Sequence, residues 1–179
     1  MSARPDTMPE TDVIELLLHQ HREIRRLFTR VQKATPQDRG EAFDRLRRFL
    51  ALHETAEEMV LHPDARKALA DGDRVIDARL AEEKHAGEMV AELEQLGPDD
   101  EGFLPALAQL KKALFEHAGR EERTEFPEMR KAHEKARLTE LGRTVKAAEA
   151  TPLTGSYAAM VDRSRDVLRQ AAQQFSDGD

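Results

Sequence analysis

Two stretches of this chain carry the same histidine, glutamate and proline positions. The first covers residues 53–63 and reads HETAEEMVLHP, and the second covers residues 117–127 and reads HAGREERTEFP. The same step of 64 residues carries His21 onto His85, so that four histidines follow one another at intervals of 32 residues. A fixed period of this length indicates a duplicated structural unit, here a pair of helical hairpins.

Apolar residues recur every three or four positions around these histidines, which is the pattern of helices with one buried face. We expect four such helices, over residues 12–31, 36–63, 74–96 and 103–127. Short breaks separate them, so neighbouring helices should be antiparallel. The predicted fold is all-α, an antiparallel up-down four-helix bundle. On the third helix, the predicted inward face carries Ala78, Ala81, His85, Met89, Leu93 and Leu96.

The two ends of the chain lack these motifs. Residues 1–10 contain two prolines and few apolar residues, so we expect a flexible N-terminal tail before a bundle over residues 11–130. Residues 131–179 are rich in charged residues that favour helix, with a break at residues 151–155. We expect one or two additional C-terminal helices that pack on the bundle.

The repeated motifs place metal-binding groups on inward faces of helices. His53 and Glu57 are four residues apart, as are His117 and Glu121, so each pair projects from one side of its helix. With His21 and one more histidine, the set offers four nitrogens and two carboxylates. That is too many ligands for one tetrahedral zinc ion, and it suits two ions bridged by the glutamates.

The order of these motifs resembles the hemerythrin-like, or HHE cation-binding, family. The resemblance covers roughly residues 10–130 and rests on His21, the two repeated stretches and the segment Glu83-Lys84-His85. It implies a non-haem di-iron centre, bridged by an oxo group or by carboxylates, which meets dioxygen, hydrogen peroxide or nitric oxide. Manganese or zinc would suit the same donor atoms. The implied ligands are His21, His53, Glu57, His85, His117 and Glu121.

One ligand of the oxygen-carrying hemerythrins has no counterpart here. Those proteins have a further histidine one turn from the third-helix histidine, where this chain has Ala81 and Met89. We therefore do not expect a reversible oxygen carrier. The candidates for an extra ligand, or for a residue that supports the ligands, are Glu58, Glu82, Glu122 and Tyr157.

The remaining histidines are predicted to lie on the surface or beside the ligands. His62 follows His53 by nine residues, and at about 100° per residue this turns it to the opposite side of an α-helix. His19 and His133 are also assigned away from the cluster.

Two functions are open for such a centre. The first is catalase-like turnover of peroxide, or reaction with dioxygen, in an oxidative-stress role. The alternative is a module that binds or senses oxygen, nitric oxide or iron without turnover.

A net charge of −7 disfavours nucleic acid as a partner, and the absence of cysteine removes thiolate ligands. No apolar run approaches the roughly 18 residues of a membrane span. We expect a cytoplasmic monomer or homodimer.

Overall fold

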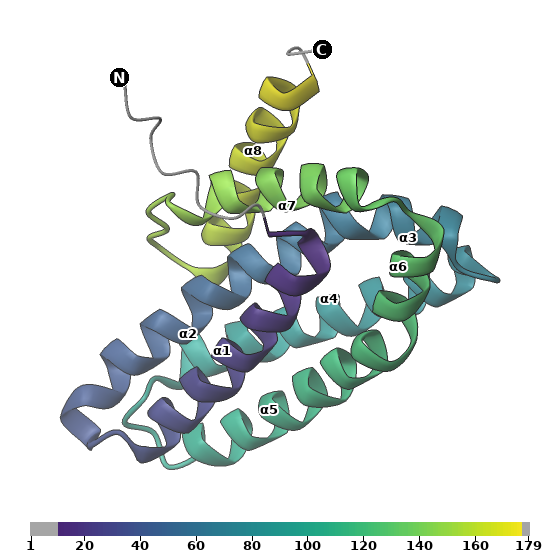
Figure 1. Cartoon of the computed structure of the whole chain (residues 1–179). Coiled ribbons are helices and arrows are strands. Elements are labelled where there is room, and N and C mark those ends of the chain that lie inside the picture. Colours follow the sequence, from purple (N-terminus) through teal and green to yellow (C-terminus); the bar gives the residue numbers. More distant parts are fainter. Residues whose placement is uncertain (1–10, 177–179) are drawn as a thin grey trace, which may run out of the picture.

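The computed structural model describes residues 11–176, which form helices and no strand. Four long helices make an antiparallel up-down bundle (Figure 1). They are α1 (Val13–Lys33), α2 (Pro36–Ala56), α4 (Gly72–Leu96) and α5 (Phe103–Arg120). The predicted all-α bundle is confirmed, and the tail predicted for residues 1–10 lies outside the described residues. No helix among the described residues is long and apolar enough to cross a lipid bilayer.

Side-chain caps fix the starts of the first two helices. The Asp12 carboxylate accepts a hydrogen bond from the backbone N–H of Glu15 at 2.9 Å, and the Thr35 hydroxyl accepts one from the N–H of Asp38 at 3.3 Å. Pro36 occupies the first turn of α2, where a missing N–H costs nothing. These caps satisfy N–H groups that have no partner within the helix.

A π-helical turn follows each repeated His-x-x-x-Glu motif. These turns are η1 (Glu57–Leu61) and η2 (Glu121–Glu125), and they lead into α3 (His62–Ala68) and α6 (Phe126–Ala132). A proline is the second residue of both α3 and α6. Proline has no N–H to donate to the preceding turn, and its ring clashes with the carbonyl group four residues earlier. The turn widens, and His62 N–H bonds to the carbonyl of Glu57 five residues back, as Phe126 N–H does to that of Glu121.

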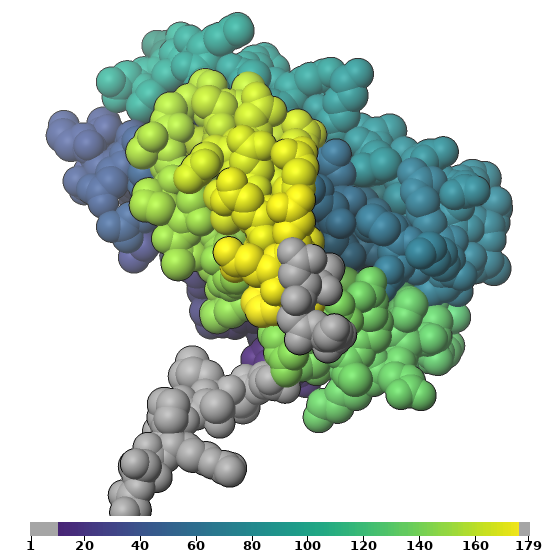
Figure 2. All heavy atoms as spheres, turned by 90° about the horizontal axis from the view of Figure 1, so that it is seen from above, coloured from purple at the N-terminus to yellow at the C-terminus, as the bar shows by residue number. Residues whose placement is uncertain are grey.

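The C-terminal region adds α7 (Lys135–Glu149) and α8 (Tyr157–Ser176). Helix α7 packs against α1, and α8 packs against α2, α4 and α7. Figure 2 shows α8 in yellow lying on the outside of the bundle. Gly142 lets α7 approach closely, because a Cβ atom there would lie 2.3 Å from the backbone oxygen of Thr11.

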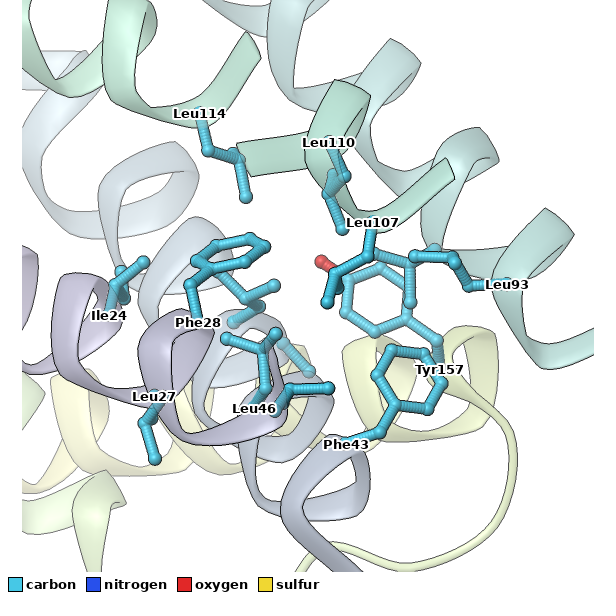
Figure 3. Packing of buried hydrophobic residues seen from close by; sticks show 14 of the residues in the cluster. Ile24, Leu27, Phe28, Phe43, Leu46, Leu93, Leu107, Leu110, Leu114 and Tyr157 are labelled. Carbon is cyan, nitrogen blue, oxygen red and sulfur yellow. The ribbon is translucent and has the colours of Figure 1, made fainter. Parts of the chain in front are cut away.

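The apolar core is divided in two along the bundle. One cluster includes Ile24, Phe28, Leu110 and Leu114 (Figure 3), and the other includes Leu17 with residues of η1, α6 and α7. His21 lies between Leu17 and Ile24 along α1, at the boundary of the two clusters. His53, Glu57, His117 and Glu121 fall at the same level. They form one buried polar layer between two apolar clusters.

Candidate metal centre

Three histidine rings meet two glutamates in the buried polar layer. His21 Nε2 lies 3.4 Å from Glu57 Oε1 and 3.4 Å from Glu121 Oε2. His53 Nε2 lies 3.3 Å from Glu57 Oε1. His117 Nε2 lies 3.6 Å from Glu57 Oε2 and 3.4 Å from Glu121 Oε1. All five side chains are buried. Helices α1, α2 and α5 supply the rings, and the π-helical turns supply the carboxylates.

The two oxygens of each glutamate face different histidines. Glu57 directs Oε1 to His21 and His53, and Oε2 to His117. Glu121 directs Oε2 to His21 and Oε1 to His117. Each carboxylate therefore spans two positions, one beside His21 and the other beside His117, as a bridging carboxylate does between two metal ions.

The other ring nitrogen of each histidine contacts an oxygen acceptor. The contacts are His21 Nδ1 to Glu122 Oε1 at 2.9 Å, His53 Nδ1 to Gln20 Oε1 at 2.8 Å, and His117 Nδ1 to Glu82 Oε2 at 2.9 Å. When Nδ1–H donates to such an acceptor, the neutral ring keeps its lone pair on Nε2. All three Nε2 atoms face the glutamates, so the rings are oriented in the form that binds metal.

These acceptors are themselves held in place. Their partners are Arg25 for Glu122 at 3.0 Å, Arg120 for Glu82 at 2.9 Å, and Glu149 for the Gln20 amide at 3.1 Å. Hydrogen bonding to His21, and then to Arg25, lowers the pKa of Glu122 to about 2. Burial opposes ionisation of Glu82, but hydrogen bonds from His117 and Arg120 outweigh it and lower the pKa of Glu82 to about 2. Both carboxylates are charged acceptors at neutral pH.

Three more buried groups extend the layer. Glu83 of α4 has Oε1 at 4.0 Å from His117 Nε2 and at 2.5 Å from His62 Nε2. Glu54 of α2 is buried as well. Ligand atoms of Glu54, Glu57, Glu83 and His117 all lie within 4.8 Å of one another. Two other groups with the same spacing overlap with this one, namely His21, His53 and Glu57, and His62, Glu83 and Glu121.

The donor atoms lack hydrogen-bond partners and have the spacing of ligands around a metal ion. Within the described residues, no hydrogen-bond partner satisfies the buried Nε2 of His21, the Nε2 of His117 or either carboxylate oxygen of Glu57 and Glu121. Ligands about 2.0–2.2 Å from one ion lie about 3 Å apart, close to the 3.3–3.6 Å spacing found here. Buried charges without partners are costly, and a bound cation removes that cost.

Burial and charge act in opposite directions on the pKa values of the layer. Burial lowers the pKa of His53 to about 4 and raises that of Glu54 well above its usual range. Burial also works against the charged form of His21, but the nearby carboxylates of Glu121, Glu122 and Glu57 raise its pKa well above the usual value. The pKa of His117 is raised in the same way. Metal binding must therefore displace protons from His21 and His117.

The structure places His85 outside the cluster, which corrects its prediction as a ligand. Its side chain is 68% exposed, and its Nδ1 lies 3.7 Å from Glu88. Ala78 and Ala81, predicted to share its inward face, are exposed too. The buried face of α4 instead carries Ile76, Arg79, Glu83, Ala86, Val90 and Leu93. His85 is two positions after Glu83, so the two side chains point about 200° apart around the helix.

The predicted extra residues divide between two environments. Glu82 and Glu122 contact the Nδ1 atoms of His117 and His21, as described above. Glu58 lies at the surface, 3.1 Å from Arg165 of α8. Tyr157 is buried with its ring in the apolar cluster drawn in Figure 3.

His62 lies in the buried layer beside the candidate ligand Glu83, so of its two predicted positions, on the surface or beside the ligands, only the surface position is wrong. The π-helical turn between His53 and His62 takes one more residue than an α-helical turn. Residues after it are set back by about 100°, which turns His62 towards the bundle interior. Sequence reasoning missed Glu54, Glu83 and His62. The proline that follows His62 was the one signal that the helix would not continue unchanged.

Three comparisons relate the chain to known proteins. The sequence matches the family model described as Hemerythrin HHE cation binding domain over residues 12–129. The fold is similar to the crystal structure of a hemerythrin HHE cation binding domain-containing protein from Mycobacterium kansasii. The TM-score is 0.66, the identity is 21%, and 94% of each chain is covered. A protein named DNA nickase from Nostoc sp. is 25% identical over 122 residues, 68% of this chain and 34% of that protein. The chain thus spans about a third of that relative's length.

Proposed function

The chain belongs to the hemerythrin HHE cation-binding family, and we propose that its buried layer holds two iron ions that react with hydrogen peroxide or dioxygen. One observation carries the proposal. The Nε2 atoms of His21, His53 and His117 converge at 3.3–3.6 Å on oxygens of Glu57 and Glu121, between two apolar clusters. Imidazole and carboxylate donors together suit iron, and manganese or zinc are alternatives.

The directions of the carboxylate oxygens support a division of the ligands between two ions. His21 and His53 would hold the first ion, because both face Glu57 Oε1. His117 would hold the second ion together with Glu83, whose Oε1 is 4.0 Å from His117 Nε2. Glu57 and Glu121 would bridge the two ions. Glu54 belongs to the group of ligand atoms with Glu57, Glu83 and His117, and His62 to the group with Glu83 and Glu121, so both would be further donors for the second ion.

The protein's own residues have three tasks at this centre. Bound iron would supply the electron-transfer chemistry that peroxide or dioxygen requires. Gln20, Glu82 and Glu122 hold the histidine rings in one orientation, which fixes the direction of each Nε2 lone pair. The apolar clusters on both sides limit the access of water. Glu54, whose pKa burial raises well above the usual range, can keep a proton beside the centre.

A binding or sensing role for oxygen, nitric oxide or iron is the second candidate. It is favoured by the chain of contacts from the centre to the C-terminal region. His53 contacts Gln20, and Gln20 contacts Glu149 at the end of α7. A change at His53 could therefore move α7 without any turnover.

Iron content and peroxide turnover test the two candidates together. The protein is loaded with ferrous iron without oxygen, freed of excess metal, and analysed for iron per chain and for the near-ultraviolet band of a bridged iron pair. Hydrogen peroxide is then added, and oxygen release is followed with an electrode. Two iron ions per chain with sustained oxygen release support the enzyme. Two ions with a spectral change and no release support binding or sensing, and a chain that retains no metal contradicts both.

A further inference from the structure

A cavity of about 350 Å³ lies between the bundle and α8, next to the buried layer. Glu54 and Glu83 line its inner end, and both belong to the group of ligand atoms around His117. The void enclosed by His21, His53 and His117 themselves holds only about 10 Å³, close to the minimum for one water molecule. The cavity beside α8 therefore reaches the candidate centre and is large enough for a small molecule.

The larger cavities of the molecule have a different position. Two of them, of about 600 and 550 Å³, lie along α1 and α2, and both are lined by Arg30 and Arg45. The motif histidines and glutamates line neither of them, within the part of the chain that the structure describes. Size alone would favour these cavities, but they do not lead to the buried layer.

Helix α8 forms one wall of the cavity. Tyr157, Val161 and Arg165 are spaced by four residues, so they project from one side of α8. Opposite Tyr157, a Cβ atom on Gly87 of α4 would lie 3.5 Å from its ring, so the glycine leaves a gap of the size of one side-chain atom. The family match ends at residue 129, so this wall is an addition to the matched domain.

The outer rim of the cavity is an ion pair. Arg165 Nη2 of α8 lies 3.1 Å from Glu58 Oε2 of η1. Both side chains are partly exposed, whereas Glu54 and Glu83 at the inner end are buried. The cavity thus runs from a charged rim to carboxyl groups beside the candidate ligands.

We propose that this cavity is the access route by which a small uncharged molecule such as hydrogen peroxide or nitric oxide reaches the metal centre. The proposal rests on the function proposed above. The inner carboxyl groups can donate hydrogen bonds to such a molecule when protonated or accept them when ionised, and an ionised carboxylate there repels anions. The volume is near the lower end of pockets that hold organic ligands, which limits the route to small species.

The test uses nitric oxide as an uncharged probe of the iron-loaded full chain. Val161→Trp places a large side chain in the cavity. The matched control, Ala158→Trp, places the same side chain on the exposed side of α8. The rate of nitric oxide binding is measured by stopped-flow absorbance, and iron per chain is measured on the same samples. A second variant, Arg165→Ala, removes the rim ion pair and should raise the binding rate instead of lowering it.

We expect Val161→Trp to lower the binding rate about tenfold, because binding must then wait for a side chain or α8 to move. Ala158→Trp should bind at the rate of the unchanged protein, and Arg165→Ala should bind faster. Iron content should be the same in all four proteins. Equal binding rates in iron-loaded Val161→Trp and Ala158→Trp would overturn the access route and leave the metal centre standing. If Val161→Trp does not fold, an unchanged rate in Arg165→Ala overturns it. Absence of iron in the unchanged protein overturns the metal centre and the route together.

Discussion

The assignment of Glu83 rather than His85 to the metal centre gives the sharpest prediction. Glu83→Gln keeps the size of the side chain and an oxygen that can accept the hydrogen bond from His62, so the fold should be retained. It removes one negative charge at 4.0 Å from His117 Nε2. The matched variant is His85→Ala, which changes an exposed side chain on the same helix.

The size of the effect follows from the charge removed. Two unit charges about 4 Å apart interact by about 4 kcal/mol at the effective dielectric constant of about 20 that suits protein sites. Each 1.4 kcal/mol changes a dissociation constant about tenfold. We therefore expect Glu83→Gln to raise the dissociation constant of the ion beside His117 at least about a hundredfold. His85→Ala should leave both ions bound. The second, more weakly held ion should be lost from Glu83→Gln first.

Chelator competition measures this difference. The iron-loaded proteins are titrated with a chelator of known affinity, and iron per chain is followed together with the spectrum of the bridged pair. Glu83→Gln should fall to one ion at a chelator concentration that leaves His85→Ala with two. The reasoning is refuted if His85→Ala loses an ion and Glu83→Gln does not, because His85 would then be the ligand.

Three other predictions concern the surroundings of the centre. Gln20→Ala removes the acceptor for His53 Nδ1 and should weaken iron binding about 10- to 100-fold in the same chelator competition. The pKa values of Glu82 and Glu122 are lowered to about 2, so their stabilisation is present above the ordinary value of 4.5 and is lost as pH falls towards 2. Denaturant unfolding of the metal-free protein should show a falling free energy across that range, and a smaller fall when both residues are glutamine. Leu110→Ala, in the centre of one apolar cluster, should cost about 2–5 kcal/mol in the same unfolding assay and leave iron per chain unchanged.

The helices could be predicted because their buried faces are mostly apolar. The stripes around His21 and His117 have leucine, isoleucine or phenylalanine one turn away, so the period of 3.6 residues is plain in the sequence. The same stripes direct Glu57 and Glu121 inwards, since each follows a buried histidine by four residues. The family resemblance and the position of the candidate site depend on these positions.

The inward face of α4 could not be predicted in this way. Two of its members, Arg79 and Glu83, are charged, so the buried face does not look apolar, and the 64-residue step favoured His85 instead. Arg79 is tolerated there because its Nε lies 2.5 Å from the buried carboxylate of Glu125 in η2. That pairing joins residues 46 positions apart in the sequence, and only the fold brings them together.

The position of His62 depends on a local change of helix type. Proline at position 63 predicts a disturbance of the helix, but a bend, an end and a π-helical turn are all compatible with it. The side chain that comes to face the centre differs between these outcomes. Each of the two π-helical turns begins with Glu-Glu and is followed by a proline. We therefore expect a π-helical turn where the same pattern follows a buried His-x-x-x-Glu motif in another chain.

Anomalous X-ray diffraction at the iron absorption edge tests the central claim most directly. Crystals of the iron-loaded protein should give two strong peaks between Glu57 and Glu121, one beside His21 and His53 and the other beside His117 and Glu83. No peak in the buried layer, or a peak bound to His85 instead, would contradict a di-iron centre built from these residues.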